Sequence, residues 1–172
     1  MGLSKQDLED YEGAIVDYTK TIELDPDYAS AYYNRGNAKD DLEDYYGAIA
    51  DYTKAIELDP DDAEAYNNRG NTKSSLGDNY GAIADYTKAI ELDPDDAVAY
   101  YNRGNAKDDL EDYYGAIADY TKAIELNPDY AVAYMARGVA KSNIGLPYCS
   151  DLNKACELGY EDACGWYNKQ CR

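Results

Sequence analysis

The sequence predicts an all-α fold, a right-handed superhelical solenoid of antiparallel helix pairs, because it repeats itself every 34 residues. The motif YTK-x-IEL-[DN]-P ends four units, at Pro26, Pro60, Pro94 and Pro128. Residues 31–60 and 99–128 are identical except for one Asp-to-Asn exchange, at Asp59 and Asn127. A single helix pair cannot bury its apolar face, whereas stacked neighbours can, so such a period is typical of a quasi-one-dimensional array.

Each unit is predicted to form two helices, as residues 29–42 and 45–58 of the second unit illustrate. Asp44 is suited to cap the second helix, and Pro60 ends it, because proline disfavours helical geometry in the residue before it. Apolar residues of this helix recur with helical spacing at Ala48, Ile49, Tyr52, Ala55 and Ile56. They predict a buried stripe, with the tyrosine hydroxyl reaching a polar rim.

The period divides the chain into six parts. They are a partial first repeat (1–28), three full repeats (29–62, 63–96 and 97–130), a divergent fifth repeat (131–160) and a C-terminal capping helix (161–172). The first repeat lacks the opening turn of its first helix, so we expect a fragment or a designed chain. We expect the uncovered face of this repeat to pair with a second copy of the chain.

The 34-residue helix–turn–helix pattern resembles the tetratricopeptide repeat. The residues that carry the resemblance in the second unit are Tyr32, Gly36, Ala48, Tyr52, Ala55 and Pro60. The chain departs from the family where Tyr32 replaces its Trp, Arg35 its Leu and Lys39 its Tyr. The resemblance implies that the first helix of each unit lines a concave groove that binds a protein or peptide.

The overall charge excludes several kinds of partner. Acidic residues number 35 against 16 basic ones, for a formal net charge of -19. Such a surface repels nucleic acid and anionic lipid, and no apolar run is long enough to span a bilayer. We expect no nucleic-acid partner and no membrane partner.

The sequence lacks histidine and the motifs that most often indicate catalysis. The chain has no His, the commonest general base and a common metal ligand. Neither a GxxxxGK[ST] loop nor an HExxH motif occurs, and the acidic clusters lack the calcium-loop pattern. We predict a non-catalytic protein with no catalytic residues, no cofactor and no metal site.

Asparagines recur at two positions of the groove-lining helices. One set lies two residues before the helix glycine, and the other lies one residue after it: Asn34, Asn68 and Asn102, then Asn37, Asn71 and Asn105. An amide offers both donors and an acceptor, so ladders of asparagines can hold an extended peptide backbone. The first ladder resembles that of glycosyltransferase members of the family. The fifth unit breaks the pattern with Ala136 and Val139.

The neighbouring groove positions predict a neutral to basic peptide. They are occupied by Tyr33, Asn67 and Tyr101, and about two turns further along stand the aspartates that would make the groove acidic: Asp40, Asp41, Asp108 and Asp109. Family members that clamp acidic C-terminal tails use cations here, because carboxylate recognition requires them. The alternative is a structural or engineered repeat protein with no natural ligand, in which repetition alone keeps the asparagines.

Two recurring cations of the first helix, Arg35 and Lys39, are expected to be structural. They lie one turn apart, so their heads can meet acids such as Asp51 of the following helix. The glycine between them, Gly36, predicts a close approach of two helices.

All 4 cysteines fall in the divergent C-terminal segment. Two helices joined at Gly159 would bring them together as nested pairs, Cys149 with Cys171 and Cys156 with Cys164. Cysteines seven residues apart on a helix lie about 10 Å apart along its axis, too far for one zinc ion to bind all four. Two disulfides would indicate an oxidising compartment, periplasmic or secreted. The alternative is four reduced thiols in a cytoplasmic protein.

Overall fold

The computed structural model describes residues 5–171, with side chains from residue 10 onward. Every regular element within that range is an α-helix. The chain divides into two compact units, Met1–Leu92 and Asp93–Arg172. The predicted fold class, an all-α solenoid of antiparallel helix pairs, is confirmed.

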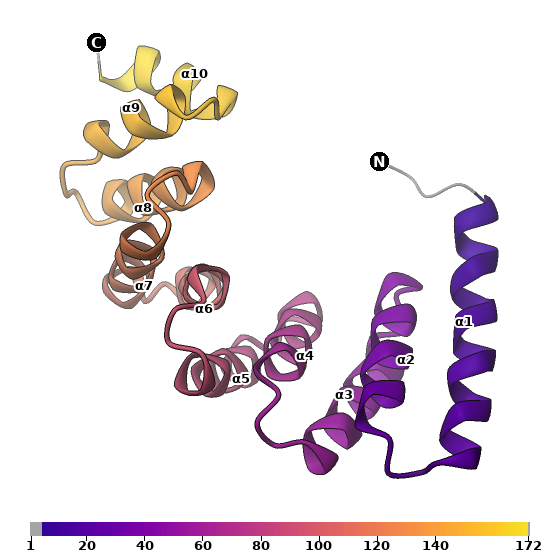
Figure 1. Cartoon of the computed structure of the whole chain (residues 1–172). Helices are drawn as coiled ribbons and strands as arrows, with labels where there is room; N and C mark the ends of the chain where they lie inside the picture. The colour runs from indigo at the N-terminus through magenta and orange to yellow at the C-terminus, as the bar shows by residue number, and fades with distance from the viewer. Residues whose placement is uncertain (1–4, 172) are drawn as a thin grey trace. The chain divides into compact units, whose positions relative to one another are not determined.

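The first unit contains five helices, each packed against the next (Figure 1). They are α1 (Lys5–Leu24), α2 (Ala29–Asp41), α3 (Tyr45–Leu58), α4 (Ala63–Ser75) and α5 (Asn79–Leu92). In addition, α2 contacts α4 directly. These two helices are the first helices of consecutive repeats, so their shared face is the groove side of this unit.

The second unit has the same order of packing. It comprises α6 (Ala97–Asp109), α7 (Tyr113–Leu126), α8 (Ala131–Asn143), α9 (Cys149–Glu157) and α10 (Glu161–Gln170). Here α6 contacts α8 as α2 contacts α4. No helix in the described part of the chain is both long enough and apolar enough to cross a membrane.

Aspartate side chains cap the start of several helices. Asp44 Oδ1 accepts a hydrogen bond from Gly47 N at 3.1 Å at the start of α3, and Asp112 accepts one from Gly115 N at 3.0 Å at the start of α7. Such caps satisfy backbone donors that a helix leaves unpaired. The predicted cap at Asp44 is confirmed.

The core between paired helices is made of small residues around one tyrosine. Tyr52 is 2% exposed and Ala48 is fully buried. A Cβ added at Gly36 would lie 2.8 Å from Tyr52 Cε1. Glycine is therefore required at this position, because it lets α2 approach α3 closely enough to pack on the ring.

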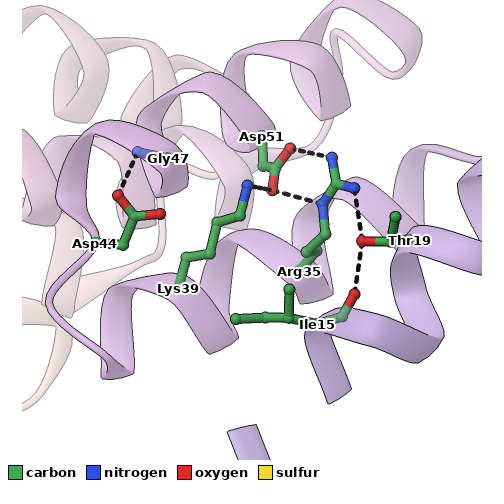
Figure 2. A network of polar contacts seen from close by, with 7 residues as sticks. All are labelled: Ile15, Thr19, Arg35, Lys39, Asp44, Gly47 and Asp51. Atoms are coloured by element: carbon green, nitrogen blue, oxygen red, sulfur yellow. Dashed lines mark hydrogen bonds and ion pairs between the residues drawn. The ribbon is translucent and has the colours of Figure 1, made fainter. Parts of the chain in front are cut away.

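A buried carboxylate binds two cations in each of repeats two to five. Asp51, 4% exposed, accepts from Arg35 Nη2 at 2.7 Å and from Arg35 Nε at 2.8 Å. The Lys39 ammonium lies 2.7 Å from Asp51 Oδ2, the oxygen that also accepts from Arg35 Nε (Figure 2). Equivalent ion pairs form around Asp85, Asp119 and Asp151. The predicted structural role of these cations is confirmed.

The same arginine also joins neighbouring repeats. Arg35 Nη1 donates to Thr19 Oγ1 at 3.0 Å, and Thr19 in turn donates to Ile15 O at 2.7 Å (Figure 2). The Arg35 guanidinium lies 5.6 Å from the centroid of the Tyr32 ring, within the range of a cation–π contact. One side chain thereby fixes both the pairing within a repeat and the stacking on the previous one.

Two disulfides close the C-terminal helix pair. Cys149 is bonded to Cys171 and Cys156 to Cys164, the nested pairs expected from their spacing. They join the start of α9 to the residue after α10, and the end of α9 to the first turn of α10. This short pair is therefore held covalently at both ends.

Replacing Asp51 by alanine is expected to lower the unfolding free energy by about 3 kcal/mol, because it leaves two partly buried cations unpaired. Glu57→Ala is the matched control: its exposed ion pair with Lys54 predicts a change within about 0.5 kcal/mol. Urea unfolding followed by circular dichroism measures both. Equal losses in the two variants would contradict the structural role of Asp51.

Thiol titration of the chain unfolded without reductant is expected to find no reactive thiols. Reduction should then lower the unfolding free energy of the α9–α10 pair by about 2–4 kcal/mol, because the unfolded segment regains conformational entropy. Four thiols before reduction would show that the cysteines are not bridged.

Candidate functional site

A polar cavity lies between α2 and α4 in the first unit. Its volume is about 350 Å³. It is lined by Asn37, Asp40, Asp41, Tyr52, Asn68 and Asn71. Five of these belong to α2 and α4, and the tyrosine reaches it from α3. The cavity therefore lies on the face where the first helices of consecutive repeats meet.

Hydrogen bonds connect this lining to the core. Asn37 Oδ1 accepts from Tyr52 Oη at 2.8 Å and from Asn68 Nδ2 at 3.2 Å. Asn68 Nδ2 also donates to Tyr33 Oη at 3.0 Å. These bonds occupy the carbonyl oxygen of Asn37, and the same side chain also hydrogen-bonds Tyr33, so it is held in place on the cavity wall.

The two aspartates of the cavity differ in their surroundings. Asp40 Oδ1 accepts from Thr72 Oγ1 at 2.6 Å, and that threonine is 1% exposed. Asp41 is exposed. Burial raises the pKa of Tyr52, and the charge of Asp40 adds to the effect. The tyrosine therefore stays protonated and keeps donating to Asn37.

Cations of α2 and α4 do not offset this negative charge. Arg35 and Lys39 bind Asp51, and Arg69 and Lys73 bind Asp85. Their charges are neutralised between the helices, so the carboxylates of Asp40 and Asp41 dominate the cavity.

The corresponding face of the second unit is different. Asn105 Oδ1 accepts from Tyr120 Oη at 2.8 Å, as in the first unit. However, α8 carries Ala136, Val139 and Ala140 where α4 carries Asn68, Asn71 and Thr72. Tyr101 instead packs near two other rings, 5.8 Å from Tyr120 and 5.1 Å from Tyr130 between centroids.

This difference leaves one carboxylate oxygen without a partner. Asp108 corresponds to Asp40, and Ala140 to Thr72. Asp108 Oδ1 is buried and accepts no hydrogen bond within the described residues. Burial raises the pKa of Asp108, and the charge of Asp109 raises it further. The groove of the second unit therefore contains an unsatisfied acceptor that the first unit does not.

The structure brings together only some of the residues predicted from sequence. Asn37, Asp41, Asn68 and Asn71 line the cavity. Tyr33 lies beside it and is joined to it through Asn68. Asn34 lies outside the lining and donates to Ser30 O of its own helix at 2.8 Å.

The remaining predicted residues lie elsewhere. Asn67 is not part of the cavity lining. Tyr101, Asn102, Asn105 and Asp109 belong to the second unit.

Two further lining residues are Asp40, which was expected to make the groove acidic, and Tyr52. The tyrosine was assigned to the core, and it does lie there with its hydroxyl directed to the groove. The contact between Asp40 and Thr72 was not predicted, although Thr72 stands where other repeats have Ala38 and Ala106. Within the described residues, no group of three or more Cys, Asp or Glu side chains is arranged to hold a metal ion.

Comparisons with known proteins identify the family. The model described as "Tetratricopeptide repeat" matches residues 29–62, 63–96 and 97–130, and one described as "TPR repeat" matches residues 2–39. The chain therefore belongs to the tetratricopeptide repeat family. No curated protein matches it significantly.

Solved structures agree with this assignment. A crystal structure of MamA has a TM-score of 0.83 at 30% identity and covers 92% of this chain and 88% of its own. YrrB, "a TPR protein with an unusual peptide-binding site", has a TM-score of 0.81 at 23% identity over 96% and 86%; at that identity the likeness concerns the fold alone. The first TPR of Spaghetti (RPAP3), "bound to HSP90 peptide SRMEEVD", has a TM-score of 0.67 at 26% identity over 68% and 93%.

Exchanging the residue at the Thr72 and Ala140 positions is expected to exchange the hydrogen bonding of Asp40 and Asp108. Ala140→Thr should raise the unfolding free energy by about 1 kcal/mol by giving Asp108 a donor, and Thr72→Ala should lower it by a similar amount. Urea unfolding at neutral pH measures both. A destabilising Ala140→Thr would contradict this account of Asp108.

The pH dependence gives a second readout of the same exchange. A carboxyl group with a raised folded-state pKa binds more protons when folded, so its contribution destabilises the fold as the pH rises from its ordinary value of 3.8 through the folded-state pKa. The difference in unfolding free energy between Ala140→Thr and the parent chain should therefore grow with pH across that window. A constant difference would show that Asp108 titrates normally.

Proposed function

We propose that this chain is a non-catalytic protein-interaction scaffold that binds an extended, neutral to basic peptide segment in the asparagine-lined, acidic groove of its first unit. The observation that carries the proposal is the cavity between α2 and α4, where amide donors lie beside the carboxylates of Asp40 and Asp41. The amide of Asn37 is suited to a peptide carbonyl, and the carboxylates are suited to backbone N–H groups or basic side chains.

Charge supports the basic preference. The chain has a formal net charge of -19, and the described cations of α2 and α4 that lie near the cavity are bound to buried aspartates. A field of this sign steers basic partners and repels nucleic acid and anionic membranes. The RPAP3 domain binds a peptide, which supports peptide binding as the general mode. Its peptide ends in acidic residues, and the groove of this chain lacks the cations to hold them.

Rigidity of the lining supports a binding role. Asn37 accepts hydrogen bonds from Tyr52 and Asn68, and Asp40 accepts one from Thr72. Side chains that are already ordered lose little further conformational entropy when a ligand binds. The alternative, a structural or engineered array without a ligand, is favoured by the near identity of residues 31–60 and 99–128.

Two further parts of the proposal concern the cellular compartment and self-association. Disulfides persist in oxidising surroundings, so Cys149–Cys171 and Cys156–Cys164 favour a periplasmic or secreted protein. Self-association through α1 stays a prediction; Val16 and Leu24 are 53% and 87% exposed there.

A screen of capped peptides biased toward Lys and Arg tests the proposal. The selected peptide is expected to bind the parent chain, whereas SRMEEVD should show no binding by calorimetry. Asp41→Asn should weaken the affinity for the selected peptide about threefold to tenfold, because an exposed hydrogen-bond acceptor loses its charge. Asp61→Asn is the control, since it removes the same charge from an exposed turn outside the cavity.

Two results would count against the proposal. The first is a screen that enriches no peptide, which would favour the array without a ligand. The second is an equal loss of affinity in Asp41→Asn and Asp61→Asn, which would show that only net charge matters.

A further inference from the structure

We propose that the second unit holds a chemically different subsite, formed by α6, α8 and α10, that takes an apolar side chain of a peptide with a basic residue beside it. The proposal depends on the proposed function only for the peptide nature of the ligand, because none of its residues lines the cavity of the first unit.

The groove face of α8 is apolar where that of α4 is polar. Ala133 and Gly138 are buried as Ala65 and Gly70 are, so the two helices present the same faces to their neighbours. At the positions of Asn68 and Asn71, which line the cavity of the first unit, α8 carries Ala136 and Val139. Met135 stands at the position of Asn67, next to them in sequence. All three are partly exposed, so apolar surface replaces the amides on the side that faces a ligand.

The helix after the α8–α9 pair, α10, carries a further exposed apolar residue. Ala163 of α10 is fully buried, as Ala133 of α8 is. Trp166 lies three residues after it, which is the position of Ala136 in α8 and of Asn68 in α4. The Trp166 side chain is 45% exposed. Helical register therefore places an exposed indole on the groove side of α10, next in order after the apolar face of α8.

The opposite edge of this surface is acidic. Asp108 and Asp109 lie at the end of α6, which contacts α8. Asp108 has lost the donor that Thr72 gives Asp40, and its Oδ1 accepts no hydrogen bond within the described residues. A lysine or arginine side chain of the ligand supplies a charge complementary to the carboxylates of Asp108 and Asp109.

The arrangement also sets an order for the ligand. Asp162 and Lys169 lie about one turn before and one turn after Trp166 on α10, so their charges offset each other at that end, whereas the end of α6 carries two carboxylates. The basic residue is therefore expected toward α6, and the apolar side chain over α8 and α10. Several exposed apolar residues beside charged ones favour an interaction site, whereas single exposed apolar residues are ordinary.

Trp166 is the only tryptophan in the chain, so its fluorescence reports on this subsite without a label. Four capped peptides on Gly-Ser flanks, with centres Leu-Arg-Leu, Ser-Arg-Ser, Leu-Glu-Leu and Ser-Glu-Ser, are titrated at physiological salt. Leu-Arg-Leu is expected to shift the Trp166 emission to shorter wavelength. It should also bind about tenfold more tightly than any of the other three, because burial of one leucine contributes on that scale.

A triple variant, Met135→Asn with Ala136→Asn and Val139→Asn, gives α8 the residues that α4 already carries. It is expected to fold, which circular dichroism checks, and to lose the preference for Leu-Arg-Leu over Ser-Arg-Ser. Val139→Ile is the conservative control and should retain that preference. Asp108→Asn should lose the preference for Leu-Arg-Leu over Leu-Glu-Leu.

Equal binding of the four peptides, or a triple variant that keeps the leucine preference, would overturn the proposal. Asp41→Asn separates this subsite from the cavity of the first unit, because it should leave the Trp166 response unchanged. If Asp41→Asn abolishes the Trp166 response, the apolar subsite does not act independently and the proposal fails.

Discussion

The fold depends on a buried carboxylate that binds two cations in each of repeats two to five. Asp51 joins α3 to Arg35 and Lys39 of α2, and the same arginine reaches Thr19 of α1. Removing one partner from such a buried ion pair is strongly destabilising. The pairing of two helices and their stacking on the previous repeat are therefore fixed together, by one geometry that recurs at Asp85, Asp119 and Asp151.

This constraint also determines the character of the groove. Because the described arginines and lysines of α2 and α4 turn toward buried aspartates, the outward face of these helices is left to amides, tyrosines and carboxylates. Core tyrosines connect the two regions, since Tyr52 packs against Gly36 and bonds Asn37 in the cavity. The ligand-facing side chains are ordered by the same packing that stabilises the helix pairs.

The repeats are nearly identical in their cores and differ on the groove side. Thr72 and Ala140 occupy equivalent buried positions, yet one satisfies Asp40 and the other leaves Asp108 Oδ1 unpaired. The exchange of Asn68 for Ala136 likewise changes a hydrogen-bonded face into an apolar one. Positions that differ between repeats are therefore the best guide to the ligand that each part of the groove binds. Positions shared by all repeats mainly reflect the packing of the helices.

The sequence by itself determined the helix pairs, the cap at Asp44, the pairing of the cysteines and the partnership of Arg35 with Asp51. These features depend on local periodicity or on spacing within one helix hairpin. Only the tertiary structure decided that Asn68 bonds Asn37 while Asn34 bonds its own helix, and that Thr72 reaches Asp40. Those contacts join residues 31 and 32 positions apart, so they depend on how repeats stack and which rotamers the stacking allows.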